Sequence, residues 1–262
     1  MANVWIEGFA VVVHTPKSAA SRAPGVPAAA FPMETALDIL CAKLGMDPLA
    51  WRLLNSATEG PRASHGPAWP RIGFVEVLQA AQDHPHYATP RTGPYRGRGV
   101  GSGLWRTNTG PSSAVAVVHN DGRVPVTEGA PDIGGTRASI AQQVAETLGI
   151  PFEAIHPAVG HTDAVGFTSV TGGSGVTCKT GWAAYTAAQE SKRQMCERAA
   201  KTGSVPVEQG TYADGMVRDT MDPARCLTCK QIAARQVATG GPSVGRSGVN
   251  PPGAGRRWAP TL

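Results

Sequence analysis

The chain has 262 residues and a mass of 27.1 kDa, which allow one large domain or two of modest size. Apolar residues make up 41% and charged residues 16%, a composition that excludes a disordered tail, and no run of about 18 apolar residues is present to cross a membrane. The formal net charge of +5 lies largely in the last stretch, so a basic nucleic-acid binder is a weak alternative.

Five cysteines are scattered along the chain, and the first residues carry no basic segment followed by an apolar one. The sequence therefore predicts a reduced, cytoplasmic protein. Cys226 and Cys229 form a single Cys-x-x-Cys pair, and His156 and His161 lack partners at metal-binding spacing. We expect no side-chain metal site, and we expect the two cysteines to fill apolar space beside Leu227.

The start of the chain is predicted to change from short strands to a helix. Apolar runs at 4–6 and 11–13 are typical of strands, and two prolines and a glycine make Arg22–Pro27 a loop. Apolar residues three and four positions apart then predict a helix from Met33 to Leu44, which Gly45 ends.

A second, short helix is expected after Asp47-Pro48, because aspartate accepts hydrogen bonds from free helix amides and proline suits the first helical position. Glu34 and Asp38 lie one turn apart on the preceding helix, and a solvated face explains them better than paired acid–base chemistry. Residues 56–95 are expected to be irregular apart from a short helix around Phe74–Leu78, and the internal domain boundary is expected there.

The second part of the chain is predicted to open with a β-hairpin. Two β-rich runs, at 113–119 and 123–127, flank the turn signal Asn120-Asp121-Gly122. Pro125 has no amide hydrogen to donate, so the return strand is expected at a sheet edge or a bulge.

Helices and a strand then alternate. A helix with the apolar face Ile140, Val144 and Leu148 is predicted after Thr136, and Gly149 ends it. A strand is predicted over 154–159 and a long alanine-rich helix over 182–200. Residues beyond Gly203 show only loosely patterned helical and β pieces. The fold class is therefore α+β, with mixed helices and sheets.

Two glycine-rich loops each lead into one of these helices: Asp132–Arg137 and Thr171–Thr177. A helix start presents unpaired amides and the positive end of its dipole, and glycines let an anionic or polar ligand approach the backbone. Together the loops could cradle a phosphorylated cofactor. Neither is a P-loop or a dinucleotide fingerprint, and on pattern alone both are also explained as plain turns.

Three stretches that carry these features resemble one family: Arg22–Asn55, Gly97–Pro151 and Gly160–Ala184. Their order, their spacing and their residues resemble the molybdopterin-binding large subunit of the xanthine dehydrogenase, aldehyde oxidase and carbon monoxide dehydrogenase family. The resemblance spans nearly the whole chain and becomes thin after Gly203. It implies an incomplete α+β fold, with the end of a first molybdopterin-binding domain at 1–94 and the start of a second at 95–262.

The resemblance also implies a cofactor: molybdopterin carrying molybdenum, in bacteria often as the cytosine dinucleotide. Its expected contacts are backbone groups of Arg22, of Gly134 and Gly135, and of Gly172, Gly173 and Ser174, with no side-chain ligand to the metal. Such a large phosphorylated ligand suits glycine-rich helix starts better than histidine or cysteine clusters.

Four positions depart from the family's pattern. Gly134 stands where a glutamine usually reaches the metal's apical ligand, and Pro24 stands where purine-oxidising relatives have a phenylalanine. His161 replaces an aspartate, and Gly175 replaces a frequent arginine. These departures disfavour a purine substrate and leave the substrate open.

The implied reaction of a complete enzyme is hydroxylation of an aldehyde or an N-heterocycle, with electrons leaving through iron–sulfur and FAD partner subunits. The catalytic residues are unknown, because the family's general-base glutamate and an upstream cofactor loop are expected outside these 262 residues. We expect this chain alone to be inactive and to expose apolar surface. The alternatives are a non-enzymatic binding or structural domain, or an inactive remnant.

Overall fold

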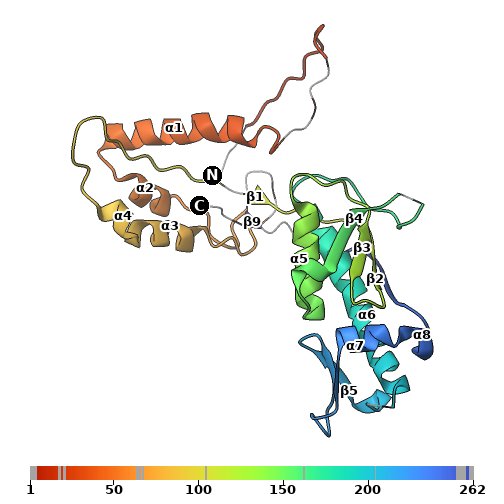
Figure 1. Cartoon of the computed structure of the whole chain (residues 1–262). Helices are drawn as coiled ribbons and strands as arrows, with labels where there is room; N and C mark the ends of the chain where they lie inside the picture. Colours follow the sequence, from red (N-terminus) through yellow and green to blue (C-terminus); the bar gives the residue numbers. More distant parts are fainter. Residues whose placement is uncertain are drawn as a thin grey trace. The chain divides into compact units, whose positions relative to one another are not determined.

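The computed structural model describes residues 5–16, 19, 22–62, 66, 68–103, 105–161, 163–203, 205–251 and 258–259. Backbone contacts divide the chain into two compact units, residues 1–106 with 255–262 and residues 107–254. Figure 1 shows both units and labels most of their helices and strands. No helix in the described ranges has the length and apolar character needed to span a membrane.

The first unit is mainly helical. Its elements are α1 (Val26–Leu44), α2 (Pro48–Leu54), α3 (Phe74–Asp83), α4 (Pro85–Ala88) and the antiparallel pair of β1 (Trp105–Arg106) with β9 (Trp258–Ala259). The helix expected around residue 74 is confirmed as α3, and Asp47 caps α2 as predicted by accepting from the amides of Leu49 and Ala50 at 2.9 Å.

Two predictions for the start of the chain are wrong. Helix α1 begins at Val26 instead of Met33, because Gly25 adopts a left-handed conformation (φ +77°) and Pro27 falls in the first turn, where no amide donor is needed. The loop therefore ends before Pro27. The described residues 5–13 form no strand, and their side chains are exposed, while Val4 lies outside the described residues.

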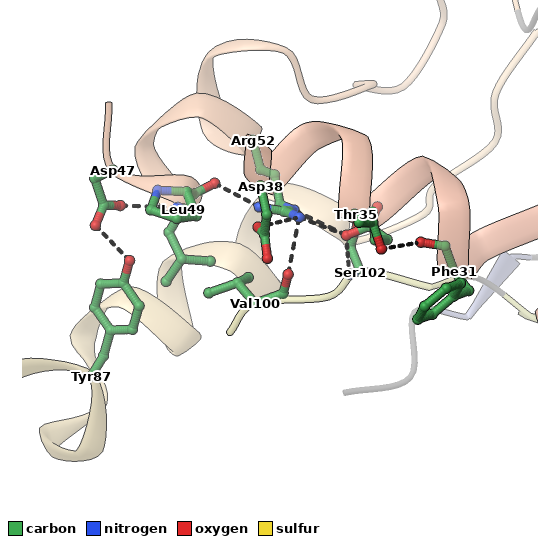
Figure 2. A network of polar contacts seen from close by, with 11 residues as sticks. Phe31, Thr35, Asp38, Asp47, Leu49, Arg52, Tyr87, Val100 and Ser102 are labelled. Atoms are coloured by element: carbon green, nitrogen blue, oxygen red, sulfur yellow. Dashed lines mark hydrogen bonds and ion pairs between the residues drawn. The ribbon is translucent and has the colours of Figure 1, made fainter. Parts of the chain in front are cut away.

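A buried arginine joins α1 and α2 (Figure 2). The Arg52 side chain is 2% exposed, and its guanidinium donates to the Glu34 carboxylate at 2.7 Å and to the carbonyl of Val100 at 3.1 Å. The amide of Ser102 also donates to Glu34 at 2.7 Å. The solvated face expected for Glu34 is therefore wrong, because this carboxylate is the counter-ion of Arg52.

The second unit is built on a four-stranded mixed sheet in the order β4-β3-β2-β8. Its strands are β2 (Ser112–Val118), β3 (Val124–Glu128), β4 (Ile155–Val159) and β8 (Ser243–Val249). The predicted hairpin is confirmed as β2 and β3, and β4 follows a 3₁₀ turn at Phe152–Ala154.

The edge position expected for Pro125 is wrong. Strand β3 lies between β2, which runs antiparallel to it, and β4, which runs parallel. The paired residues of β2 and β3 end at Val126, so Pro125 falls just outside that ladder and its missing amide hydrogen breaks no bond there.

Two helices cover one face of this sheet, α5 (Thr136–Leu148) and α6 (Gly181–Lys201), and a π-helical turn at Val176–Thr180 leads into α6. The inward residues of β2 and β3 alternate with half-buried ones, and they pack on the alanines of α6. Small residues bring α6 close to β8, since a Cβ on Gly245 would lie 1.9 Å from the carbonyl oxygen of Ala187.

A smaller β-meander and two short helices complete the second unit. They are β5 (Gly210–Ala213), β6 (Met216–Asp219), β7 (Cys226–Thr228), α7 (Cys229–Ala234) and α8 (Gln236–Thr239), with a 3₁₀ turn at Val207–Gln209. Cys229 is buried beside Leu227, as predicted for a filler, whereas Cys226 is exposed. Helices and mixed sheets together confirm the α+β class.

Candidate cofactor-binding loops

The first glycine-rich loop forms the start of α5. Gly134 and Gly135 have left-handed backbones (φ +81° and +100°), both are exposed, and open space surrounds the position of a Cβ on either. Asp132 caps the helix, because one of its carboxylate oxygens accepts from the amides of Gly135 at 3.1 Å and Thr136 at 3.0 Å. Two of the amides that the sequence predicted to be free are therefore already occupied.

The Asp132 cap also sets the charge of this loop. Its second oxygen accepts from Arg137 at 2.8 Å, and this bond together with one from the Thr136 hydroxyl at 2.9 Å lowers the pKa of Asp132 to about 2. The carboxylate is ionised at neutral pH and already opposes the positive end of the α5 dipole. The first loop thus offers space and a polar backbone, but little attraction for a phosphate.

The second glycine-rich loop is different. Gly173 and Ser174 have left-handed backbones (φ +59° and +57°) and are exposed, and the Gly173 carbonyl is held by the amide of Asn108 at 2.7 Å. Within the described residues, the amides of Gly172 and Gly173 donate to no acceptor. Successive amides in such a turn form a concave site for an anion.

A buried lysine lies under the second loop. Lys179, on the π-helical turn, is fully buried, and its ammonium donates to the carbonyls of Ser169 at 3.0 Å and Val170 at 2.5 Å and to the Ser169 hydroxyl at 2.7 Å. Burial lowers the pKa of Lys179. The Lys179 side chain therefore holds the start of the loop, at Ser169 and Val170, while the Asn108 amide holds Gly173.

The two loops precede helices that pack on each other. The Gln143 side chain of α5 donates to the carbonyl of Thr177 at 3.1 Å, and a Cβ on Gly181 would lie 1.9 Å from the Gln143 side-chain oxygen. The turns at Gly134-Gly135 and at Gly172–Ser174 therefore precede two helices that pack on each other, and a shared site between the turns stays a prediction. Arg22 belongs to the first unit, where it has a left-handed backbone (φ +36°), and its role stays a prediction.

Glu128, at the end of β3, is a buried carboxyl that sequence reasoning missed. It is fully buried on the strand face that carries Val124 and Val126, and one carboxyl oxygen accepts from the amide of Ala130 while the other has no partner among the described residues. Burial raises the pKa of Glu128, and the nearby Asp132 charge adds to the rise. The strand alternation from Val124 onward could have revealed this burial.

Replacing Glu128 with glutamine should therefore stabilise the second unit at neutral pH, by about 1 kcal/mol. A raised folded-state pKa means that the protonated carboxyl stabilises the fold. The free energy of unfolding should therefore fall as the pH rises above the ordinary pKa of a glutamate side chain. In urea unfolding at several pH values, the free energy of unfolding of the wild type should fall as the pH rises, whereas that of Glu128→Gln should not. The matched change Glu146→Gln, on the exposed side of α5, should leave the pH dependence intact.

An apolar cavity of about 500 Å³ in the first unit is a poorer candidate. Its lining is mostly apolar, as at Met33 and Phe74, and its carboxylate and hydroxyl groups, Glu34 and Ser102, already bind each other. It lacks the free polar groups that a phosphorylated cofactor needs. In the described residues no three histidine, cysteine or acidic side chains gather to hold a metal.

Comparison with known proteins gives the family. Models of the molybdopterin cofactor-binding domain match residues 1–56 and 75–254. The chain therefore belongs to the molybdopterin-binding domains of the molybdenum hydroxylase family, whose members are molybdenum-dependent oxidoreductases. The glycine turns of the second unit fit a ligand held by backbone groups.

Relatives and solved structures agree with this family. The aldehyde oxidoreductase molybdenum-binding subunit PaoC of Escherichia coli K12 is 32% identical to this chain, and the match covers 77% of this chain and 28% of PaoC. The putative xanthine dehydrogenase molybdenum-binding subunit XdhA of the same strain is 31% identical, and the match covers 53% of this chain and 20% of XdhA. A Cu,Mo-CO dehydrogenase structure matches 89% of this chain and 34% of its own with TM-score 0.70 and 21% identity. The structure of the aldehyde oxidoreductase of Desulfovibrio desulfuricans covers 87% of this chain and 24% of its own, with a TM-score of 0.59 and 25% identity. The chain spans less than a third of the length of these two curated relatives.

Proposed function

We propose that this chain holds a molybdopterin cofactor through backbone groups of its two glycine-rich loops. The observation that carries the proposal is the pair of left-handed turns, Gly134-Gly135 and Gly173-Ser174, each placed before one of two packed helices. Gly172 belongs to the second turn, and Arg22 is proposed as a further contact. The cytosine dinucleotide form is our proposal, because it offers a pyrophosphate for the amides of the second turn.

The domain division proposed with this function follows the family pattern, with residues 1–94 ending one molybdopterin-binding domain and residues 95–262 beginning another. In a complete enzyme we propose hydroxylation of an aldehyde or an N-heterocycle, in the cytoplasm. The bound cofactor would supply the oxygen-transfer and redox chemistry. The protein's described residues would bind and orient it, and iron–sulfur and FAD subunits would carry the electrons away.

Cofactor retention by the full chain tests the proposal. The chain is produced in a host that makes molybdopterin, and bound pterin is measured by fluorescence after release. Gly134→Asn keeps a residue type that tolerates a left-handed backbone and fills the open space over the first loop, so we expect bound pterin to fall by about tenfold, the effect of roughly 1.4 kcal/mol.

Gly203→Asn is the matched control, since Gly203 also has a left-handed backbone (φ +70°) with open space around it, but it follows α6 away from both loops. Pterin content should stay at the wild-type level in this variant. A wild-type chain without pterin, or an equal loss in both variants, would instead favour a non-enzymatic domain or an inactive remnant.

A further inference from the structure

A second cavity in the first unit, of about 590 Å³, is lined by positive charge. Arg91, Arg96 and Arg98 line it together with His86, and no acidic side chain of the described residues belongs to its lining. The sequence itself contains no aspartate or glutamate over 84–120. A cleft lined by charges of one sign attracts a counter-ion more strongly than the same charges on an open surface.

Two of these arginines keep their hydrogen-bond donors for a ligand. In the part of the chain that the structure describes, Arg91 and Arg96 are exposed, join no ion pair and donate to no acceptor. Arg98 is half-buried and held in place, because it donates to the carbonyls of Tyr87 and, at 2.6 Å, of Thr89. Its guanidinium also lies 5.3 Å from the centre of the Tyr87 ring.

The charge of Asp47 is already used beside this cavity. Its carboxylate accepts from the Tyr87 hydroxyl at 2.5 Å and from the amides of Leu49 and Ala50 at 2.9 Å, and among the described residues it forms no ion pair with Arg98. Like charges around one cavity repel each other. A bound anion would remove that repulsion.

An apolar cavity of about 450 Å³ adjoins the basic one, since His86, Arg98 and Gly99 line both. Apolar side chains make up much of the rest of its lining: Leu49, Ala80, Ala81 and Val100. Leu49 and Val100 are seen in Figure 2 on the side of the network that carries Tyr87. Apolar walls with a few convergent charged groups are the usual form of a site for a small organic molecule.

We propose that the first unit binds an organic phosphate in this double cavity. The phosphate is held by the guanidinium groups of Arg91 and Arg96, whose planar forks match phosphate oxygens, and the carbon part of the ligand enters the cavity beside Leu49 and Val100. A doubly charged phosphate balances three arginines better than a single carboxylate does. The site uses no residue of the glycine-rich loops, so it does not depend on the proposed function.

Binding of phenyl phosphate to the full chain, measured by titration calorimetry at low salt, tests this inference. We expect phenyl phosphate to bind about tenfold more tightly than inorganic phosphate, because only the ester also buries a ring in the apolar cavity. Arg91→Gln and Arg96→Gln should each weaken the binding of phenyl phosphate by about tenfold, since each removes charged hydrogen bonds to the phosphate.

Ala81→Leu separates the two parts of the site. Ala81 is half-buried on α3 and lines only the apolar cavity of the two, so a leucine there should fill this space. We expect the affinity for phenyl phosphate to fall to that for inorganic phosphate, while the affinity for inorganic phosphate stays unchanged.

Arg71→Gln is the matched control for charge, because Arg71 is an exposed arginine of the same unit that lines neither cavity. Both affinities should stay at the wild-type level in this variant. Thermal unfolding without ligand shows that each variant is folded, and Arg91→Lys, which keeps the charge without the planar fork, should retain part of the affinity.

Three results would overturn the inference. The first is a wild-type chain that does not bind phenyl phosphate. The second is binding that Arg91→Gln and Arg96→Gln leave unchanged, or that Arg71→Gln weakens equally, because the phosphate would then bind elsewhere or respond only to net charge. The third is equal affinity of the wild type for phenyl phosphate and inorganic phosphate, which would remove the apolar cavity from the site.

Discussion

Replacing Glu34 with alanine should lower the free energy of unfolding of the first unit by about 3 kcal/mol, because the change leaves a buried guanidinium without its main partner. Arg52 is 2% exposed at its side chain, and Asp38, its other carboxylate, lies 3.6 Å away and is partly exposed. The amide and hydroxyl of Ser102 would lose the same acceptor. Asp38 on α1 lies farther from the guanidinium than Glu34 does, and the Pro48 carbonyl at the start of α2, which accepts from it at 3.0 Å, carries no charge (Figure 2).

The pKa of Glu34 supports the same expectation. Burial acts to raise it, but the hydrogen bonds from Ser102 and Arg52 outweigh burial and lower it. A lowered folded-state pKa means that the ionised carboxylate stabilises the fold, and this stability is lost as pH falls through the acidic range. Denaturant unfolding followed by tryptophan fluorescence measures both effects.

Glu59→Ala provides the matched control for this experiment, because Glu59 pairs with Arg71 at 3.9 Å where both side chains are exposed. Exposed pairs contribute at most about 1 kcal/mol. Equal destabilisation by Glu34→Ala and Glu59→Ala would contradict a buried ion pair in the first unit.

The second large effect is expected at Gly245, where β8 meets α6. An alanine Cβ there would lie 1.9 Å from the Ala187 carbonyl oxygen and 2.6 Å from the Ser191 hydroxyl oxygen, distances that real atoms do not adopt. Strand and helix would have to separate, and the cost of such overpacking is about 3 kcal/mol. Thermal or urea unfolding of Gly245→Ala measures the loss.

Gly248→Ala tests the same substitution on the same strand, at a position where nothing lies within 4 Å of the new Cβ. We expect a change below about 1 kcal/mol there, because a strand tolerates alanine at least as well as glycine. If both variants unfold alike, the close approach of α6 to β8 is absent in solution.

Local signals predicted much of this fold. The hairpin around Gly122 and the helix carrying Ile140 follow from turn chemistry and three-and-four spacing, which act over a few residues. The start of α1 was missed because Pro27 reads as a helix breaker unless its place in the first turn is known. The interior place of β3 depends on β4, which joins from beyond a helix, so no local pattern around Pro125 could reveal it.

The candidate site was predictable in its backbone but not in its charges. Glycine spacing located both loops before helices, as the structure has them. Lys179 stands in a polar stretch that resembles a surface, and it is buried because β2, α5 and α6 enclose the π-helical turn. The Arg52 and Glu34 pair likewise depends on residues 18 positions apart and on a third segment, at Ser102.

Amide hydrogen exchange with and without bound molybdopterin tests the central claim most directly. Backbone contact with the cofactor predicts that the amides of Gly134, Gly172 and Gly173 exchange more slowly in the loaded chain. The amide of Gly122 in the same unit, which donates to the His119 carbonyl within its own hairpin, should not change. The claim would be contradicted if neither glycine-rich loop exchanged more slowly in the loaded chain, or if the Gly122 amide slowed by the same amount.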